Sequence, residues 1–204
     1  METVKGIIVN TIVLAVVYWL FIYESVTIHK PGIIIPYIPD QTNPSIKQPF
    51  KVDQFSYKVL ADMKVEAKVL GVEKYRHDAF SEISPIDLAL GWQKMSDQAV
   101  IDTIDISQSG RFYRWKMNKN AGIAPSEVTI SSANFHIIPA SEQVKNTLKD
   151  VLRGDIVSMT GHLVYVKNEQ TGTQYRSSLT RSDSGPGACE VFYVTDMDII
   201  QIAN

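Results

Sequence analysis

Residues 55–69, FSYKVLADMKVEAKV, alternate between two kinds of side chain. Every odd-numbered position from Phe55 to Val69 is apolar or aromatic, while the even-numbered positions are mostly Ser, Lys, Asp and Glu. A period of two places one set of side chains on each face of an extended strand. Half-buried strands of this kind are typical of antiparallel sheets. The segment therefore predicts one long antiparallel strand, with a single interruption near Asp62.

The chain after Phe50 continues to favour extended structure. Residues 99–106 and 111–115 flank the turn SQSG and predict a hairpin. Gly161 interrupts a largely apolar segment, which is typical of a bulge or of a sharply coiled strand. Further strands are expected over residues 128–138, 155–166, 175–181 and 189–200.

Two short segments carry helix signals. Residues 84–91, SPIDLALG, begin with Ser84 as a candidate N-cap and Pro85 at the first helical position, and a glycine ends the segment. Residues 141–153 begin with a second candidate cap, Ser141, and then place apolar residues at helical spacing. Both segments are therefore expected to be helices.

About seven strands and two short helices predict a single mostly-β or α+β domain over residues 51–204. The glycine-containing strand that follows the second helix, with hairpins after it, resembles part of an OB-type barrel in the C-terminal third. The stretches 84–92 and 177–190 are also similar to segments of bacterial membrane-anchored proteins. That similarity favours a bacterial source and suggests no chemistry.

The N-terminus contains a long uncharged segment. Residues 6–23, GIIVNTIVLAVVYWLFIY, lack any charged side chain, and roughly 17–20 apolar residues suffice to cross a bilayer as a helix. Aromatic residues gather at its C-terminal end, as is typical of the headgroup level. A cleaved signal peptide and a buried core helix are the alternatives, but no small-x-small cleavage site follows the segment. We therefore expect an uncleaved single-pass signal anchor.

The flanks of this anchor suggest its orientation. Residues 1–5 form a short tail expected in the cytoplasm, and the large remainder of the chain is expected on the extracytoplasmic, periplasmic side of the inner membrane. Residues 24–50 contain five prolines and exclude regular helix. Two interpretations remain open for this spacer: it holds the domain away from the membrane, or residues 32–38 lie across the domain as an edge strand.

Composition limits the classes of partner. The formal net charge is −2 and Lys and Arg are not clustered, so a nucleic-acid partner is not expected. The single cysteine, Cys189, cannot form an internal disulfide. No two histidines have the short spacing of a metal motif, so neither a metal nor another cofactor is expected.

The stretch SSLTRSDSGPGACE, residues 177–190, is rich in polar and turn-forming residues. Gly185-Pro186-Gly187 fits a type II turn between two hairpin arms, residues 177–181 and 189–194. Arg181 and Asp183 then lie at the mouth of the hairpin. They are candidates either for an ion pair that orders the loop or for a clamp that binds a ligand.

Cys189 allows two interpretations. Alternation along its strand favours a small buried side chain in the core. The alternative is a reactive thiol, with His136 as its base and Arg181 as the residue that holds an anion. Trp92 and Trp115 are candidates for an aromatic binding surface.

The expected function is a binding or assembly domain of the bacterial cell envelope. No complete catalytic group can be assembled, and a serine nucleophile in a G-x-S-x-G turn is absent from the sequence, so an enzyme is less expected than a binding protein. The partner would be another envelope protein or a cell-wall component, in an oligomeric state that the sequence does not assign. A thiol-dependent enzyme and an OB-like ligand-binding module remain the alternatives.

Overall fold

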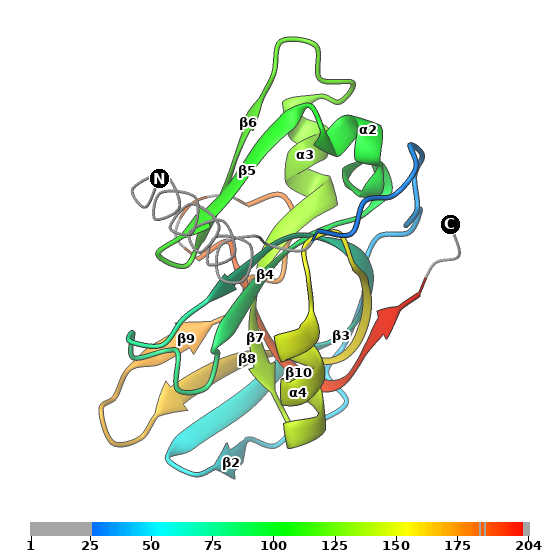
Figure 1. The fold of residues 1–204 in the computed structure, drawn as a ribbon. Coiled ribbons are helices and arrows are strands. Elements are labelled where there is room, and N and C mark those ends of the chain that lie inside the picture. Colours follow the sequence, from blue (N-terminus) through cyan, green and yellow to red (C-terminus); the bar gives the residue numbers. More distant parts are fainter. Residues whose placement is uncertain (1–25, 184, 186, 202–204) are drawn as a thin grey trace, which may run out of the picture.

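The computed structural model describes residues 26–183, 185 and 187–201 (Figure 1). The predicted cytoplasmic tail and the predicted anchor over residues 6–23 lie outside the described residues. Within the described ranges, no helix is both long enough and apolar enough to cross a membrane.

The described residues form a mostly-β fold with short helices, as expected. The strands are β1 (Asp40–Thr42), β2 (Phe50–Val52), β3 (Phe55–Lys74), β4 (Ile86–Gly91), β5 (Ile104–Ser109), β6 (Phe112–Met117), β7 (Ser132–Pro139), β8 (Ile156–Asn168), β9 (Gln174–Arg176) and β10 (Glu190–Ile200). The helices are a 3₁₀ helix η1 (Gln93–Ser96) and the α-helices α2 (Gln98–Ile101), α3 (Pro125–Ser131) and α4 (Glu142–Asp150).

The long alternating strand is confirmed. In β3, all eight odd-numbered side chains from Phe55 to Val69 are at most 5% exposed. The register with β8 shifts between Val59 and Ala61, close to the interruption expected near Asp62. The extra residue lets the first part of β3 contribute to a different core from the rest of the strand.

Five strands close into a ring. β3 pairs with β4, β4 with β7, β7 with β10, β10 with β8, and β8 returns to pair with β3. The β7–β10 pair is parallel and the other four pairs are antiparallel. The ring encloses the largest hydrophobic core, which includes the fully buried Leu88, Phe135 and Phe192. Helix α4 packs Val144 and Leu148 against this core.

Gly161 has the role that its position in β8 predicts. The register between β8 and β10 shifts between Val194 and Asp196, opposite this glycine. A Cβ atom at residue 161 would overlap the backbone oxygen of Tyr193. Glycine therefore allows the two strands to approach closely at the bulge.

Within the segment 84–91, residues Ile86–Gly91 form strand β4, so the expected helix there is wrong. All six residues of β4 are buried, and the strand pairs with β3 on one side and β7 on the other. Burial on both faces removes the alternation that marks a strand, which leaves the local Ser-Pro signal as the stronger pattern. Ser84 does not cap a helix: its hydroxyl is buried without a hydrogen-bond partner.

Two further expected elements are confirmed, and a third begins later in the chain than expected. Helix α4 is confirmed, and the Ser141 hydroxyl caps it by accepting a hydrogen bond from the Val144 amide at 3.3 Å. The hairpin of β5 and β6 is also confirmed, although residues 98–101 before it form α2. The strand expected from residue 128 begins only at Ser132, because helix α3 extends to Ser131.

Residues 177–181 and 189–194 do not pair as two strands of a hairpin, although the Ser178 amide donates to the Cys189 carbonyl at 3.0 Å and the Val191 amide to the Ser177 hydroxyl at 3.1 Å. Strand β9 pairs with β8 instead of β10, and the Ser177 amide donates to the Val164 carbonyl of β8 at 3.0 Å. The turn itself fits the expectation. Gly187 has φ of +91°, and the Ala188 amide donates to the Gly185 carbonyl at 3.2 Å.

The proline-rich segment lies along the domain from Val26 onward. The Thr27 amide donates to the Arg153 carbonyl at 2.8 Å, and Ile35 is only 6% exposed. Strand β1 then pairs with β3 in an antiparallel register. The spacer therefore lies on the domain, but residues 32–38 form no strand, and the strand pairing occurs at β1 instead.

Candidate functional site

The outer face of the ring carries an unusual group of buried polar side chains. Alternation directs Leu88, Phe135 and Phe192 into the ring, so their neighbours in sequence face outward. Outward-facing polar residues of β4 and β7 nevertheless have little exposed surface: Asp87 has 0%, Asn134 has 4% and His136 has 9%. We call the following set the thiol cluster: Asp87, Arg111, Asn134, His136 and Cys189.

Arg111 enters the thiol cluster from the turn between β5 and β6. Gly110 and Arg111 both have positive φ, at +57° and +71°, as a two-residue type I′ hairpin requires. The Arg111 guanidinium donates to the Asp87 carboxylate at 2.7 Å and to the Asp78 carboxylate at 2.8 Å. It also lies 3.7 Å from the centre of the Tyr75 ring. These contacts offset the cost of a left-handed conformation at a non-glycine residue.

His136 lies beside the same carboxylate. Its Nδ1 atom is 2.9 Å from Oδ1 of Asp87, near enough for a strong charge interaction, but the ring is not aligned for a hydrogen bond and Nδ1 has no hydrogen-bond partner. Burial favours the neutral ring, yet interactions with Asp87 and Cys189 prevail and raise the pKa of His136 to about 9. The imidazole is therefore protonated at neutral pH.

Cys189 completes the thiol cluster immediately before β10. Its side chain is partly exposed, so the expectation of a fully buried core cysteine is wrong. The Asn134 side-chain nitrogen lies 3.8 Å from the sulfur, and the Arg111 carbonyl lies 3.7 Å from it. The thiol also interacts with the His136 ring. The fold thus brings together Cys189 and His136, the residues that were predicted from the sequence as a possible thiol and base.

A pocket of about 280 Å³ opens beside this pair. Cys189 and His136 both line it, together with the ring of Tyr175. Tyr175 stacks on Phe80 at 3.8 Å between ring centres, and Phe80 lies edge-on to His136 at 5.6 Å. The remaining wall includes Phe112, Arg176 and Val191. The pocket therefore combines a thiol, an imidazolium and an exposed guanidinium with apolar surface.

Arg181 does not join the thiol cluster. Its guanidinium contacts the Glu190 carboxylate and the side-chain oxygen of Gln41 instead. Asp183 accepts a hydrogen bond from the Ser178 hydroxyl at 2.6 Å. An ion pair between Arg181 and Asp183, one of the two alternatives, is absent among the described residues, because the buried Glu190 carboxylate is the partner of Arg181. We call the set Gln41, Ser178, Arg181, Asp183 and Glu190 the loop clasp.

Glu190 is the buried centre of the loop clasp, with no exposed surface. Burial raises the pKa of its carboxyl to about 8, although Arg181 acts in the opposite direction. Its second oxygen has no hydrogen-bond partner. Arg181 therefore links the segment before β10 to β10 itself and to β1, which is a structural task.

The two candidate tryptophans do not form an open aromatic surface. Trp92 has no exposed surface, and its indole donates to the Ile130 carbonyl at 3.1 Å. Trp115 packs against the small core between the β5–β6 hairpin and helix α3. We therefore assign Trp92 to the core rather than to a binding surface. The aromatic residues that line the pocket are Phe112 and Tyr175.

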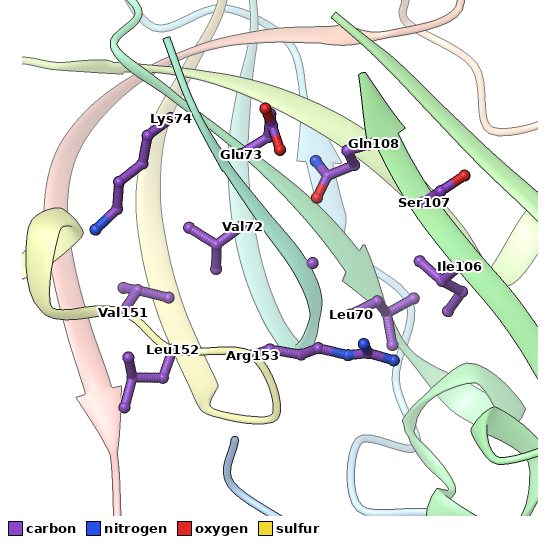
Figure 2. A pocket seen from close by; sticks show the side chains of 11 residues that line it. Leu70, Val72, Glu73, Lys74, Ile106, Ser107, Gln108, Val151, Leu152 and Arg153 are labelled. Carbon is purple, nitrogen blue, oxygen red and sulfur yellow. The ribbon is translucent and has the colours of Figure 1, made fainter. Parts of the chain in front are cut away.

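A larger groove of about 590 Å³ lies on another part of the domain (Figure 2). Its walls come from the second half of β3, from β5 and from the loop before β8, and include Val72, Ile106 and Arg153. The charged side chains Glu73, Lys74 and Arg153 form no ion pair with one another among the described residues. The groove therefore has more volume than the pocket but no cluster of reactive groups.

Sequence reasoning missed Asp87, Arg111 and Asn134. One signal was present: Asp87 is a charged residue inside an apolar segment, IDLAL, and buried carboxylates require a partner. The partner, Arg111, comes from a hairpin turn 24 residues later in the chain. Over the residues described, no group of three or more His, Cys, Asp or Glu side chains has the arrangement of a metal site.

Comparisons with known proteins find no matching family model, no matching curated protein and no matching solved structure.

Proposed function

We propose that the chain is a membrane-anchored binding module of the bacterial envelope, with an OB-like barrel as its ligand-binding domain. The strand order of the ring supports the OB-like assignment. In chain order, β3, β4, β7, β8 and β10 are its first to fifth strands, and they close in the order first, second, third, fifth, fourth. A five-stranded Greek-key barrel of this order is the architecture of OB folds.

The position of the pocket is the observation that carries the proposal. OB barrels bind ligands on the face of their second and third strands, between the loop that joins strands one and two and the loop that joins strands four and five. Here β4 and β7 supply Asp87, Asn134 and His136 on that face. The β3–β4 connection supplies Phe80, and the β8–β10 connection supplies Tyr175 and Arg176, as well as Cys189.

The charges of the pocket favour an anionic ligand group. Arg111 and protonated His136 are balanced by Asp78 and Asp87. Arg176 is exposed at the pocket and has no ion-pair partner within the described part of the chain. Beside this free charge, Phe112 and Tyr175 offer apolar surface. An acidic peptide segment of another envelope protein, with an apolar side chain next to its carboxylate, fits this combination.

The predicted anchor supports the location of this activity. A span over residues 6–23 would hold the domain at the inner membrane, with the binding face in the periplasm. Tethering raises the local concentration of the module near partners in the same membrane, so modest affinity suffices. The net charge of −2 disfavours an oligonucleotide ligand, which many OB domains bind.

Site-specific photo-crosslinking in intact bacteria tests the proposal. A photoreactive residue replaces Phe112, which lines the pocket, and a control replaces Glu142, an exposed residue of α4. We expect an envelope protein to be crosslinked from position 112 and not from position 142. Arg176→Glu should abolish the adduct without changing the amount of the chain in the membrane fraction. The same adducts from both positions, or an adduct that survives Arg176→Glu, would contradict the proposed site.

A topology measurement tests the location independently. In spheroplasts, an added protease should digest the domain from outside, while a cytoplasmic marker protein stays intact. Protection of the domain until the membrane is lysed would show that the predicted orientation is wrong.

A further inference from the structure

The thiol cluster contains reactive side chains that a binding site does not require. Cys189 is the one cysteine in the chain, and it lines the pocket with part of its surface exposed. A buried residue in contact with it, His136, has only 9% of its surface exposed and an Nδ1 atom without a hydrogen-bond partner. Both side chains open onto the same cavity. A ligand in this pocket would therefore meet a thiol beside an imidazole.

The surroundings of His136 suit proton transfer. A thiol becomes a strong nucleophile as the thiolate, and a neighbouring histidine accepts its proton. A carboxylate behind the histidine orients the ring and stabilises its charged form. Asp87 lies at this place, 2.9 Å from Nδ1, and Arg111 holds the carboxylate from its other side at 2.7 Å. The Asn134 side-chain nitrogen, 3.8 Å from the sulfur, can donate to a thiolate.

We propose that Cys189 is a reactive thiol that forms mixed disulfides with small disulfides, with His136 as the proton carrier and Arg176 as the contact for a carboxylate of the incoming molecule. This activity goes beyond the proposed binding function and does not rest on it.

The step balances without a further oxidant. In the reacting form the proton of Cys189 lies on His136, which is an imidazolium, and the Cys189 thiolate attacks one sulfur of the small disulfide. A bond forms between Cys189 and that sulfur while the original disulfide bond breaks. The departing thiolate takes the proton from His136 and leaves as a thiol. Cys189 is oxidised, and one half of the small disulfide is reduced.

Two features favour a disulfide over an acyl substrate. Attack on sulfur forms no oxyanion, so the reaction needs no set of donors beyond the thiol and its base. The cavity of about 280 Å³ has room for one arm of a small disulfide. Because the chain has no second cysteine, the mixed disulfide would persist until an external thiol removes it.

The test uses the full chain in detergent with glutathione disulfide, which carries carboxylates, and with hydroxyethyl disulfide, which carries none. Intact-mass spectrometry follows the adduct at Cys189 at neutral pH. We expect the folded chain to react with glutathione disulfide about tenfold faster than the chain unfolded in denaturant. A rate equal to or below that of the unfolded chain would overturn the proposal.

Variants separate the roles of the residues. His136→Gln should lower the rate about tenfold or more with both disulfides, because the proton carrier is lost. The matched control is His162→Gln, since His162 also contacts a carboxylate, Asp62, at 2.7 Å but has no cysteine beside it. Equal effects of the two substitutions would contradict the role of His136.

A second variant, Arg176→Ala, tests the proposal even if His136→Gln does not fold. Arg176 is exposed, so its loss should leave the fold intact. We expect the rate with glutathione disulfide to fall severalfold and the rate with hydroxyethyl disulfide to stay the same. An equal change for both probes would refute the carboxylate contact.

Discussion

Cys189 and Glu190 are neighbours in sequence but belong to different regions of the molecule. Cys189 faces outward with Val191, into the thiol cluster and its pocket. Glu190 faces inward with Phe192 and lies fully buried in the loop clasp. Alternation at the start of β10 separates the two, because adjacent side chains of a strand point to opposite faces.

The two regions use similar groups for different tasks. Each contains an arginine bound to a buried carboxylate, Arg111 with Asp87 and Arg181 with Glu190. In the thiol cluster, that pair supports a histidine and a cysteine that border a cavity. In the loop clasp, the pair joins chain segments and borders none of the described pockets. A buried ion pair therefore indicates function only when it supports reactive groups at an accessible surface.

The largest expected loss of stability comes from removing Asp87, the carboxylate of the thiol cluster. Asp87→Ala leaves Arg111 and His136 without their shared counter-ion in a buried site. Removal of one partner from a buried ion pair costs about 3–5 kcal/mol, and we expect a loss of this size in the free energy of unfolding, measured with denaturant. The control Asp183→Ala, at an exposed residue of the loop clasp, should cost less than about 1 kcal/mol.

Breaking the loop clasp should lower the free energy of unfolding by less than Asp87→Ala does. It should not change the reactivity of Cys189. Arg181→Ala removes the charged partner of Glu190, and we expect a loss of about 2–3 kcal/mol in the free energy of unfolding. The loss should be greater at pH 8 than at pH 6, because burial raises the pKa of Glu190 and the carboxyl can stay neutral at the lower pH. A slower reaction of Cys189 in this variant would contradict the separation of the two regions.

The pH dependence of stability follows from the protons that each region holds. The pKa of His136 is raised from 6.5 to about 9, so its contribution is complete below pH 6.5 and is lost as the pH rises toward 9. Glu190, raised to about 8, acts in the same direction. Burial lowers the pKa of Lys68 to about 8, which opposes this trend only above that pH.

We therefore expect the free energy of unfolding to fall by about 3 kcal/mol between pH 6.5 and pH 8. Denaturant unfolding across this range measures the slope. His136→Gln and Glu190→Gln should each flatten it, since each removes one group that holds its proton more tightly in the folded state. A slope that neither substitution changes would show that other groups dominate.

The smallest expected effect on stability is at the pocket rim. Arg176→Ala should change the free energy of unfolding by less than about 0.5 kcal/mol, as is usual for exposed residues. The same variant should weaken binding of the anionic partner and slow the reaction with glutathione disulfide. A large loss of stability would mean that Arg176 belongs with the structural residues of the loop clasp.

Part of the fold could be predicted from local patterns. The alternation of residues 55–69 and the cap at Ser141 report interactions within one element, and both expectations hold. Residues 84–91 were expected to form a helix, and this was wrong. Burial on both faces removes the alternation from β4, so the local N-cap pattern was the stronger signal. Ring closure depends on pairs such as β3 with β8, whose partners lie about 100 residues apart, and no local pattern contains it.

The candidate site could also be predicted only in part, because its contacts join residues far apart in the sequence. Cys189 and His136 could be named from their chemistry, and the parallel β7–β10 pair explains why they meet. Arg181 could not be assigned correctly, because its partner Glu190 faces the interior only as a consequence of the register of β10. Asp87 and Arg111 were missed because the β5–β6 hairpin must fold over β4 before the two charges meet.

An NMR titration of the His136 ring, in the intact chain and in two variants with neighbouring substitutions, tests most directly whether the thiol cluster is separate from the loop clasp. We expect His136 to titrate near pH 9, Cys189→Ser to lower this value, and Glu190→Gln to leave it unchanged. Titration near pH 6.5 in the intact chain, or equal shifts from both substitutions, would contradict a thiol cluster that is separate from the loop clasp.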